Sequence, residues 1–239
     1  MSKRKKLSPV DAATEFVKKH HPDCQAALLA GSVIRGESTE TSDLDIVIFD
    51  ERFKTSYRES LVEFGWSIEV FVHNSTSYTK FFNEDTERAR PSMPRMVMEG
   101  KILKGESFLA PIKKEAEELI KEGPKRWSEE EIKMKRYFIT DALDDFIGCK
   151  NRAEGLFIAS SLMSLAGEFV LRTNNQWVGS SKWMMRTLKE YDSRFANHFI
   201  QTFESYYKLN DKEKIITLVD RVLEPYGGRL FDGFSIGKE

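Results

Sequence analysis

The sequence is poor in cysteine, with Cys24 and Cys149 as its two cysteines among 239 residues. Two cysteines cannot form the disulfide framework of a small secreted domain, and these two lack the close spacing of zinc ligands. The chain also lacks an excess of charge of one sign, because 37 Lys and Arg residues balance 38 Asp and Glu residues. This balance argues against a protein that coats nucleic acid, but it allows a nucleotide site, which needs only a few local charges.

Long hydrophobic runs are missing as well. A membrane span needs about 20 apolar residues, and the least polar stretch, residues 154–168, is interrupted by glycines and serines. The basic start of the chain, residues 1–6, is not followed by the apolar core of a signal peptide. A basic, aromatic-rich stripe for a nucleic-acid strand is also missing. We therefore expect a cytoplasmic protein with neither a membrane nor a nucleic acid as its partner.

The apolar pattern changes character near the middle of the chain. Short apolar runs at residues 25–30, 44–49, 66–73 and 101–103 predict strands, and residues 9–20 and 76–85 are predicted helices. From about Phe108 the spacing is helical, and Ser128 with Glu131 fits a capping box that opens a long helix. The pattern predicts an α+β protein: a small mixed-sheet domain, residues 1–122, followed by an all-helical bundle, residues 123–239.

The most informative stretch runs from residue 28 to residue 49. An apolar strand ends at Gly31-Ser32, where glycine lets the backbone turn tightly and approach a ligand. We expect Ser32 to cap a following helix, whose first amides and the Ser hydroxyl would seat a phosphate. Arg35 would add a fixed guanidinium fork to the phosphate oxygens. The alternative interpretations are that Ser32 only caps a helix and that Arg35 is an ordinary surface residue.

Three acids stand close to these apolar strands. Asp43 and Asp45 alternate along one strand start and so share a face, while Glu69 is the single acid within the run WSIEVFV. If the two strands are neighbours, the three carboxylates form a cluster that can hold divalent ions, even two, for an in-line phosphoryl displacement. The alternative is that Asp43 and Asp45 are loop acids and that Glu69 lies on the solvated face of an edge strand.

These pieces, GSVIRG, SDLDIVIF and WSIEVFV, resemble the nucleotidyltransferase superfamily that includes DNA polymerase beta, and within it most closely the kanamycin and other antibiotic nucleotidyltransferases. The resemblance covers roughly residues 26–73. It implies transfer of a nucleoside monophosphate from an NTP with release of pyrophosphate. It also implies that Asp43, Asp45 and Glu69 bind Mg²⁺, and that the triphosphate is held by Gly31, Ser32 and Arg35.

The same resemblance extends loosely into the helical half. Aligned with the acidic helix of the kanamycin enzymes, the segment TDALDDFIGCK puts Asp145 at the position of the general base. Asp141 shares its helix face and is an alternative base. The lysine that contacts the triphosphate in the family corresponds to Lys150, shifted by one because Cys149 holds the matching position. A helix with Asp141, Asp144 and Asp145 is also typical of a plain solvated face.

The sequence thus favours a Mg²⁺-dependent nucleotidyltransferase, with ATP as the expected NTP and a small hydroxylated, aminoglycoside-like acceptor, as in antibiotic resistance. Two other hypotheses stay open. One is a protein-modifying nucleotidyltransferase of the antitoxin type, and the other is a non-catalytic module that senses nucleotide. We expect aromatic residues such as Trp177 and Trp183 to be exposed in the helical half, which leaves room for a homodimer.

Overall fold

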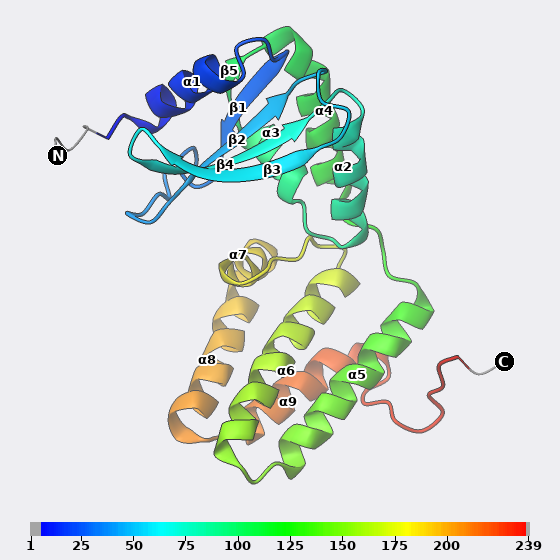
Figure 1. Ribbon diagram of the computed structural model, residues 1–239. Coiled ribbons are helices and arrows are strands. Elements are labelled where there is room, and N and C mark those ends of the chain that lie inside the picture. Colours follow the sequence, from blue (N-terminus) through cyan, green and yellow to red (C-terminus); the bar gives the residue numbers. More distant parts are fainter. Residues whose placement is uncertain (1–5, 238–239) are drawn as a thin grey trace. The chain divides into compact units, whose positions relative to one another are not determined.

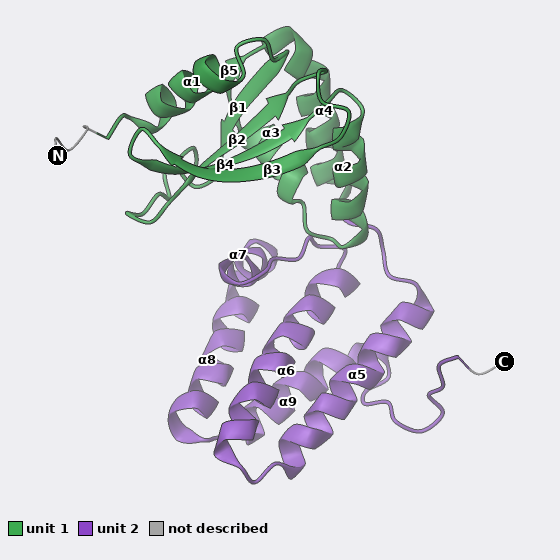
Figure 2. Ribbon diagram, in the orientation of Figure 1, with its two compact units in different colours: residues 1–123 green, residues 124–239 purple. Residues whose placement is uncertain are grey.

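The computed structural model describes residues 6–237 and divides into two compact units, Met1–Gly123 and Pro124–Glu239 (Figure 2). Residues 1–5, most of the basic start that entered the prediction about a signal peptide, lie outside the described part. The first unit contains a sheet with helices, and the second is built from helices (Figure 1). The predicted α+β fold, a small mixed-sheet domain followed by a helical bundle, is confirmed.

A five-stranded mixed sheet forms the centre of the first unit, in the order β3-β4-β2-β1-β5. β4 runs parallel to β2, and the other neighbouring pairs are antiparallel. The four strands expected from the sequence are present, each within one residue of its predicted ends. The strands are Ala26–Ala30 (β1), Leu44–Phe49 (β2), Tyr57–Glu63 (β3), Trp66–His73 (β4) and Lys101–Lys104 (β5).

Helices cover both faces of this sheet (Figure 1). One face packs against α1, whose Ala12, Ala13, Phe16 and Val17 join Leu29 in one core. The other face packs against the remaining three helices, in a second core. The helices of the unit are Pro9–His20 (α1), Ser77–Glu87 (α2), Ser92–Glu99 (α3) and Glu106–Glu122 (α4).

The central strand β2 is buried from both sides. Ile46 and Ile48 enter the core beneath α1, while Val47 and Phe49 enter the core beneath α2–α4. A strand buried on both faces has a continuous apolar sequence, as LDIVIF nearly has. Asp45 is the exception in this run, and it is only half-buried.

Two elements of the first unit were not predicted. β3 forms an edge of the sheet and exposes Arg58, Glu59 and Ser60, so its sequence shows no apolar alternation. α3 is eight residues long and contains Pro94 near its start, where proline is tolerated but weakens a helical pattern. Both elements owe their form to packing against the rest of the unit rather than to local periodicity.

The second unit is a helical bundle in which α6 contacts α5, α7, α8 and α9. Trp183 is half-buried and Trp177 is buried in this unit, so the expectation that Trp177 is exposed is wrong. The predicted capping box is confirmed, because Glu131 N donates to Ser128 Oγ at 3.1 Å and Ser128 N donates to the Glu131 carboxylate at 2.7 Å. The helices are Glu129–Gly148 (α5), Arg152–Thr173 (α6), Lys182–Tyr191 (α7), Ser193–Leu209 (α8) and Glu213–Leu223 (α9), followed by a 3-10 turn at Glu224–Tyr226.

One helix of this bundle, α6, is long enough and apolar enough to cross a bilayer, judged by length and composition alone. However, 44% of its least polar window is buried inside the protein, where Leu162, Ala166 and Phe169 are fully covered. The central helix of a bundle is apolar on all sides because other helices cover it, so the same composition occurs without a membrane. The absence of a membrane-spanning segment therefore stays a prediction.

Candidate active site

The structure brings the three predicted acids together. Asp43 lies directly before β2, Asp45 is the second residue of β2, and Glu69 lies on β4. One carboxylate oxygen of each lies within 4.8 Å of the others, and all three side chains are half-buried. Three oxygen donors at this separation can bind a single divalent ion between them.

The register of the sheet explains this convergence. In the parallel pair of β2 and β4, Asp45 lies beside Glu69, just as Leu44 lies beside Ile68. Neighbouring residues of a sheet present their side chains to the same face. The predicted adjacency of the two strands is therefore confirmed, and it is their pairing that adds Glu69 to the two aspartates.

The electrostatics of the cluster fit a bound cation. Burial, together with the charges of Asp43 and Glu69, raises the pKa of Asp45 to about 6. The guanidinium groups of Arg35 and Arg58 oppose this shift without cancelling it. A divalent ion among the carboxylates would relieve the repulsion, and an all-oxygen donor set suits a hard ion such as Mg²⁺. Asp43, Asp45 and Glu69 are thus suited to hold the metal that the sequence predicts.

The Gly31-Ser32 turn lies against the cluster. β1 ends at Ala30, which pairs with Asp45 in the antiparallel register. Gly31 follows with φ at +79°, and a Cβ atom there would lie 1.9 Å from Asp45 Oδ2. Glycine is therefore required at this position on two counts, backbone conformation and space. The turn brings backbone groups to the edge of the carboxylate cluster. Its role as a phosphate seat stays a prediction.

The helix expected to start at Ser32 is not formed, and that prediction is wrong. Residues 31–36 form a turn between two glycines with positive φ, Gly31 and Gly36, and no helix follows before β2. Instead of capping a helix, Ser32 Oγ donates to Ser42 Oγ at 3.1 Å, which links the two ends of the connection. A phosphate at this turn would meet the Ser32 hydroxyl and loop amides rather than a helix N-terminus.

Arg35 lies in the same turn, and two acids hold its guanidinium group. Its Nη1 donates to Glu99 Oε2 at 3.0 Å and its Nε donates to Glu37 Oε2 at 3.2 Å. Glu99 ends α3 and also lies 4.0 Å from the guanidinium of Arg95, one helical turn earlier. Glu99 was not predicted as a site residue because α3 was not predicted. The four-residue spacing of Arg95 and Glu99, which is typical of an ion pair on one helix face, was the signal that could have indicated this helix.

Arg58 is a further residue that the sequence did not reveal. It lies on β3, and its Nη2 donates to Glu69 Oε2 at 2.5 Å. β3 pairs with β4, so Arg58 reaches the cluster from the edge of the sheet. The residue could have been found only by first recognising that the polar segment Tyr57–Glu63 is a strand.

Asp145 and Lys150 belong to the second unit. Asp145 is exposed on the last turns of α5, and Lys150 is exposed in the connection that follows. Asp141 is also exposed, whereas Asp144 forms an ion pair with Arg229 at 3.5 Å. The structure thus places both predicted residues on accessible surface of the helical unit, and their roles stay predictions.

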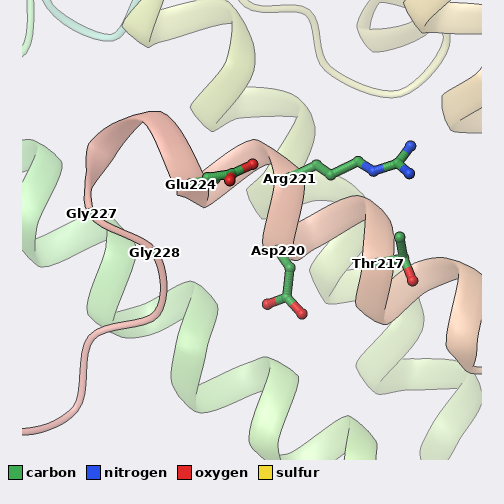
Figure 3. A pocket seen from close by; sticks show the side chains of 6 residues that line it. All are labelled: Thr217, Asp220, Arg221, Glu224, Gly227 and Gly228. Atoms are coloured by element: carbon green, nitrogen blue, oxygen red, sulfur yellow. The ribbon is translucent and has the colours of Figure 1, made fainter.

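A pocket in the second unit is lined by none of these residues. It is open to solvent and lies along α9 and the turn after it, as Figure 3 shows. One of its acids, Asp220, already accepts two hydrogen bonds from Arg229, at 2.7 and 2.9 Å. We assign no function to this pocket. Its lining residues are Thr217, Asp220, Arg221, Glu224, Gly227 and Gly228.

Comparison with known proteins decides the family. The model of the nucleotidyltransferase domain family matches residues 10–146, more than half of the chain. The chain belongs to the nucleotidyltransferase domain family. Among solved structures, this nucleotidyltransferase is similar to a nucleotidyltransferase-like protein from Exiguobacterium sibiricum 255-15. That pair shares 9% sequence identity with a TM-score of 0.48, over 90% of this chain and 74% of the other. The search of curated proteins finds no match.

The matched region of the nucleotidyltransferase includes the acid cluster, the Gly31-Ser32 turn and Asp145, while Lys150 lies beyond it. The predicted superfamily and the predicted enzyme class are confirmed. The closer resemblance to the kanamycin enzymes is not addressed by these comparisons and stays a prediction.

Proposed function

We propose that this nucleotidyltransferase transfers the nucleoside monophosphate of ATP to a hydroxyl group of a small, aminoglycoside-like acceptor. The observation that carries this proposal is the cluster of Asp43, Asp45 and Glu69 beside the Gly31 turn, in a chain of the nucleotidyltransferase domain family. Metal-binding carboxylates next to a backbone turn that can approach phosphates are what nucleotidyl transfer requires.

In this proposal the first unit holds the nucleotide. Asp43, Asp45 and Glu69 would hold Mg²⁺, as one ion or two. When bound there, Mg²⁺ would supply positive charge that stabilises the negative charge of the phosphates during transfer. The turn at Gly31 presents its backbone to the triphosphate, and the Ser32 hydroxyl donates to a phosphate oxygen. Arg35 exchanges its carboxylate partners for phosphate oxygens, which accept from a guanidinium equally well.

The transfer itself forms one bond and breaks another. The acceptor oxygen bonds to the α-phosphorus, and the bond from that phosphorus to the oxygen bridging to the β-phosphate breaks, so that pyrophosphate leaves. Asp145 accepts the proton of the acceptor hydroxyl, and Lys150 supports the charge of the triphosphate. A carboxylate can act as this base if it lies within hydrogen-bond reach of the hydroxyl.

The helical unit is the feature that favours a small acceptor over a protein partner. A nucleotidyltransferase that modifies another protein can consist of the catalytic unit alone, whereas this chain carries a whole second unit, Pro124–Glu239. We propose that this unit supplies the acceptor site, in the monomer or across a homodimer. We further propose that the enzyme acts in the cytoplasm, where ATP and Mg²⁺ are available.

The decisive experiment is calorimetric titration of the full chain with ATP, GTP, CTP and UTP in the presence of Mg²⁺. The wild type is compared with the double variant Asp43→Asn, Asp45→Asn. The matched control is Glu117→Gln, Glu118→Gln, which removes the same number of charges from exposed positions of α4. We expect ATP to bind the wild type and the control, and binding by the aspartate variant to fall at least tenfold. Acceptors are then screened by pyrophosphate release, beginning with aminoglycosides and other polyols.

Three outcomes contradict the proposal. If no NTP binds in a manner that depends on Asp43 and Asp45, the metal-triphosphate site is wrong. If ATP binds but no small acceptor causes release of pyrophosphate from ATP, while a co-purified protein becomes nucleotidylated, the acceptor class is wrong and the antitoxin-type hypothesis replaces it. Tight binding of ATP without release of pyrophosphate in the presence of any acceptor favours a nucleotide sensor.

A further inference from the structure

Arg58 has two partners on the neighbouring strand. Its Nη2 donates to Glu69 Oε2 at 2.5 Å, and its guanidinium carbon lies 5.1 Å from the centre of the Phe71 ring. The hydrogen bond to the carboxylate is charge-assisted, and the ring provides a cation–π contact. These contacts hold the guanidinium group beside the acid cluster, although 58% of the Arg58 side chain is exposed to solvent.

The sheet register puts Arg58 in this place. In the antiparallel pair of β3 and β4, Arg58 lies opposite Phe71, and Ser60 lies opposite Glu69. Arg58 is therefore diagonal to Glu69 on the same face of the sheet, a separation that a long side chain spans. A side chain of another length at position 58, or the same arginine one residue away on the opposite face, would not make this contact.

The contact opposes metal binding at Glu69. In the metal-free protein Arg58 supplies a positive charge to the cluster, and this charge acts on Asp45 as well. A divalent ion that binds to Glu69 must either displace the guanidinium group or approach it closely, and like charges repel. The triphosphate of a nucleotide removes the conflict, because its oxygens accept hydrogen bonds from a guanidinium group and carry negative charge.

We propose that Arg58 is a positioning residue, the resident counter-ion of Glu69, which weakens binding of a free divalent ion and so couples metal binding to nucleotide binding. This inference rests on the proposed function of the acid cluster. In the resting protein the arginine satisfies Glu69. When the metal arrives together with a triphosphate, Arg58 turns toward the phosphates, and Glu69 becomes a full metal ligand.

The test is a titration of the full chain with Mn²⁺, followed by electron paramagnetic resonance of the free ion, with and without the non-hydrolysable analogue αβ-methylene-ATP. Arg58→Met removes the charge but keeps an unbranched apolar stem over Phe71. Arg58→Lys keeps the charge without the fork. Lys80→Met is the control, because Lys80 is an exposed cation of the same unit that pairs with Glu84 on α2. Thermal melts establish that each variant is folded.

We expect Arg58→Met to bind Mn²⁺ alone roughly fivefold more tightly than the wild type, the scale of removing one nearby charge at a solvent-exposed site. Arg58→Lys and Lys80→Met should stay within a factor of two of the wild type. The analogue should then enhance Mn²⁺ binding less in Arg58→Met than in the wild type. Loss of a merely structural contact would not raise metal affinity, so a gain identifies the charge as the cause.

The outcomes separate this inference from the proposed function. If Mn²⁺ binds in a manner that depends on Asp43 and Asp45, but Arg58→Met binds it equally or more weakly, the inference is overturned and the metal site stands. If the wild type and Arg58→Met both fail to bind Mn²⁺, with or without the analogue, the metal site and the inference are overturned together.

Discussion

Gly31 and Asp45 are in such close contact that a single added carbon on Gly31 would lie 1.9 Å from the Asp45 carboxylate oxygen. The backbone of the turn at Gly31 therefore packs directly against Asp45, the central acid of the cluster. This contact links the part of the site that approaches phosphates to the part that binds metal.

We expect Gly31→Ala to abolish metal-dependent nucleotide binding and to lower stability by about 1–2 kcal/mol, because the methyl group displaces Asp45 and the positive φ disfavours alanine. Calorimetric titration with Mg²⁺ and ATP measures the first effect, and urea denaturation measures the second. Gly36→Ala is the matched control, since Gly36 has φ at +72° but open space around its Cβ position. Equal loss of nucleotide binding in both variants would contradict a specific role of the contact with Asp45.

A second prediction concerns the pH dependence of stability. The folded pKa of Asp45 is about 6, above the value near 3.9 of an unfolded aspartate. Folding therefore favours the protonated form, and this contribution to stability is lost as the pH rises from about 4 to about 6. Without metal, Asp45→Asn should be more stable than the wild type above pH 6, by at most about 3 kcal/mol. The advantage should disappear near pH 4 and shrink with Mg²⁺, as thermal melts would measure.

Asp50 supplies the opposite case. It is fully buried at the end of β2, and hydrogen bonds from Arg52, with Nη2 at 2.7 Å, hold its pKa below the ordinary value. Asp50→Asn should therefore lower the melting temperature at neutral pH. The difference in melting temperature from the wild type should shrink as the pH falls through the pKa that Asp50 has in the folded protein. If both asparagine variants lower stability at pH 8, the electrostatic explanation of Asp45 is wrong.

A third prediction concerns the partner of Arg35. Because Glu99 accepts a hydrogen bond from Arg35 at 3.0 Å, it competes with any phosphate for the guanidinium group. We expect Glu99→Gln to raise ATP affinity about threefold and Arg35→Met to lower it about tenfold, the scale of one charge-assisted hydrogen bond. Titration at saturating Mg²⁺ measures both. A loss of affinity in Glu99→Gln would mean instead that Glu99 orients Arg35 for the phosphates.

A fourth prediction distinguishes the acids of α5. If Asp145 is the general base, Asp145→Asn should lower kcat about 100-fold while ATP affinity stays unchanged. Asp141→Asn should have the smaller effect. Asp144→Asn is the control, because Asp144 pairs with Arg229. Rates of pyrophosphate release with an accepted substrate measure kcat, and a larger loss in Asp141→Asn would reassign the base.

The parts of the fold that the sequence predicts are those in which burial follows a simple period. β2 and β4 are apolar runs because helices or neighbouring strands cover them. Asp45 and Glu69 stand out as interruptions of those runs, and Asp43 lies directly before the first. Asp43, Asp45 and Glu69 could therefore be named, and even their convergence expected, once the strands were assumed to be neighbours. The geometry that resulted is the predicted one.

The parts of the structure that were not predicted correctly from the sequence depend on tertiary packing. Tyr57–Glu63 becomes a strand because β4 offers a free edge, and its own polar sequence does not require one. As a result, Arg58 was missed. The helix predicted after Ser32 failed because a serine after a glycine is equally compatible with a loop turn. Here the bond from Ser32 to Ser42 closes that loop.

The capping box of Ser128 and Glu131 has a consequence for the independence of the helical unit. α5 begins with its own initiation signal after the break at Gly123-Pro124, so the helical unit does not rely on α4 to start its first helix. A first helix that carries its own cap can form without the first unit, so we expect residues 124–239 to fold as a separately expressed polypeptide.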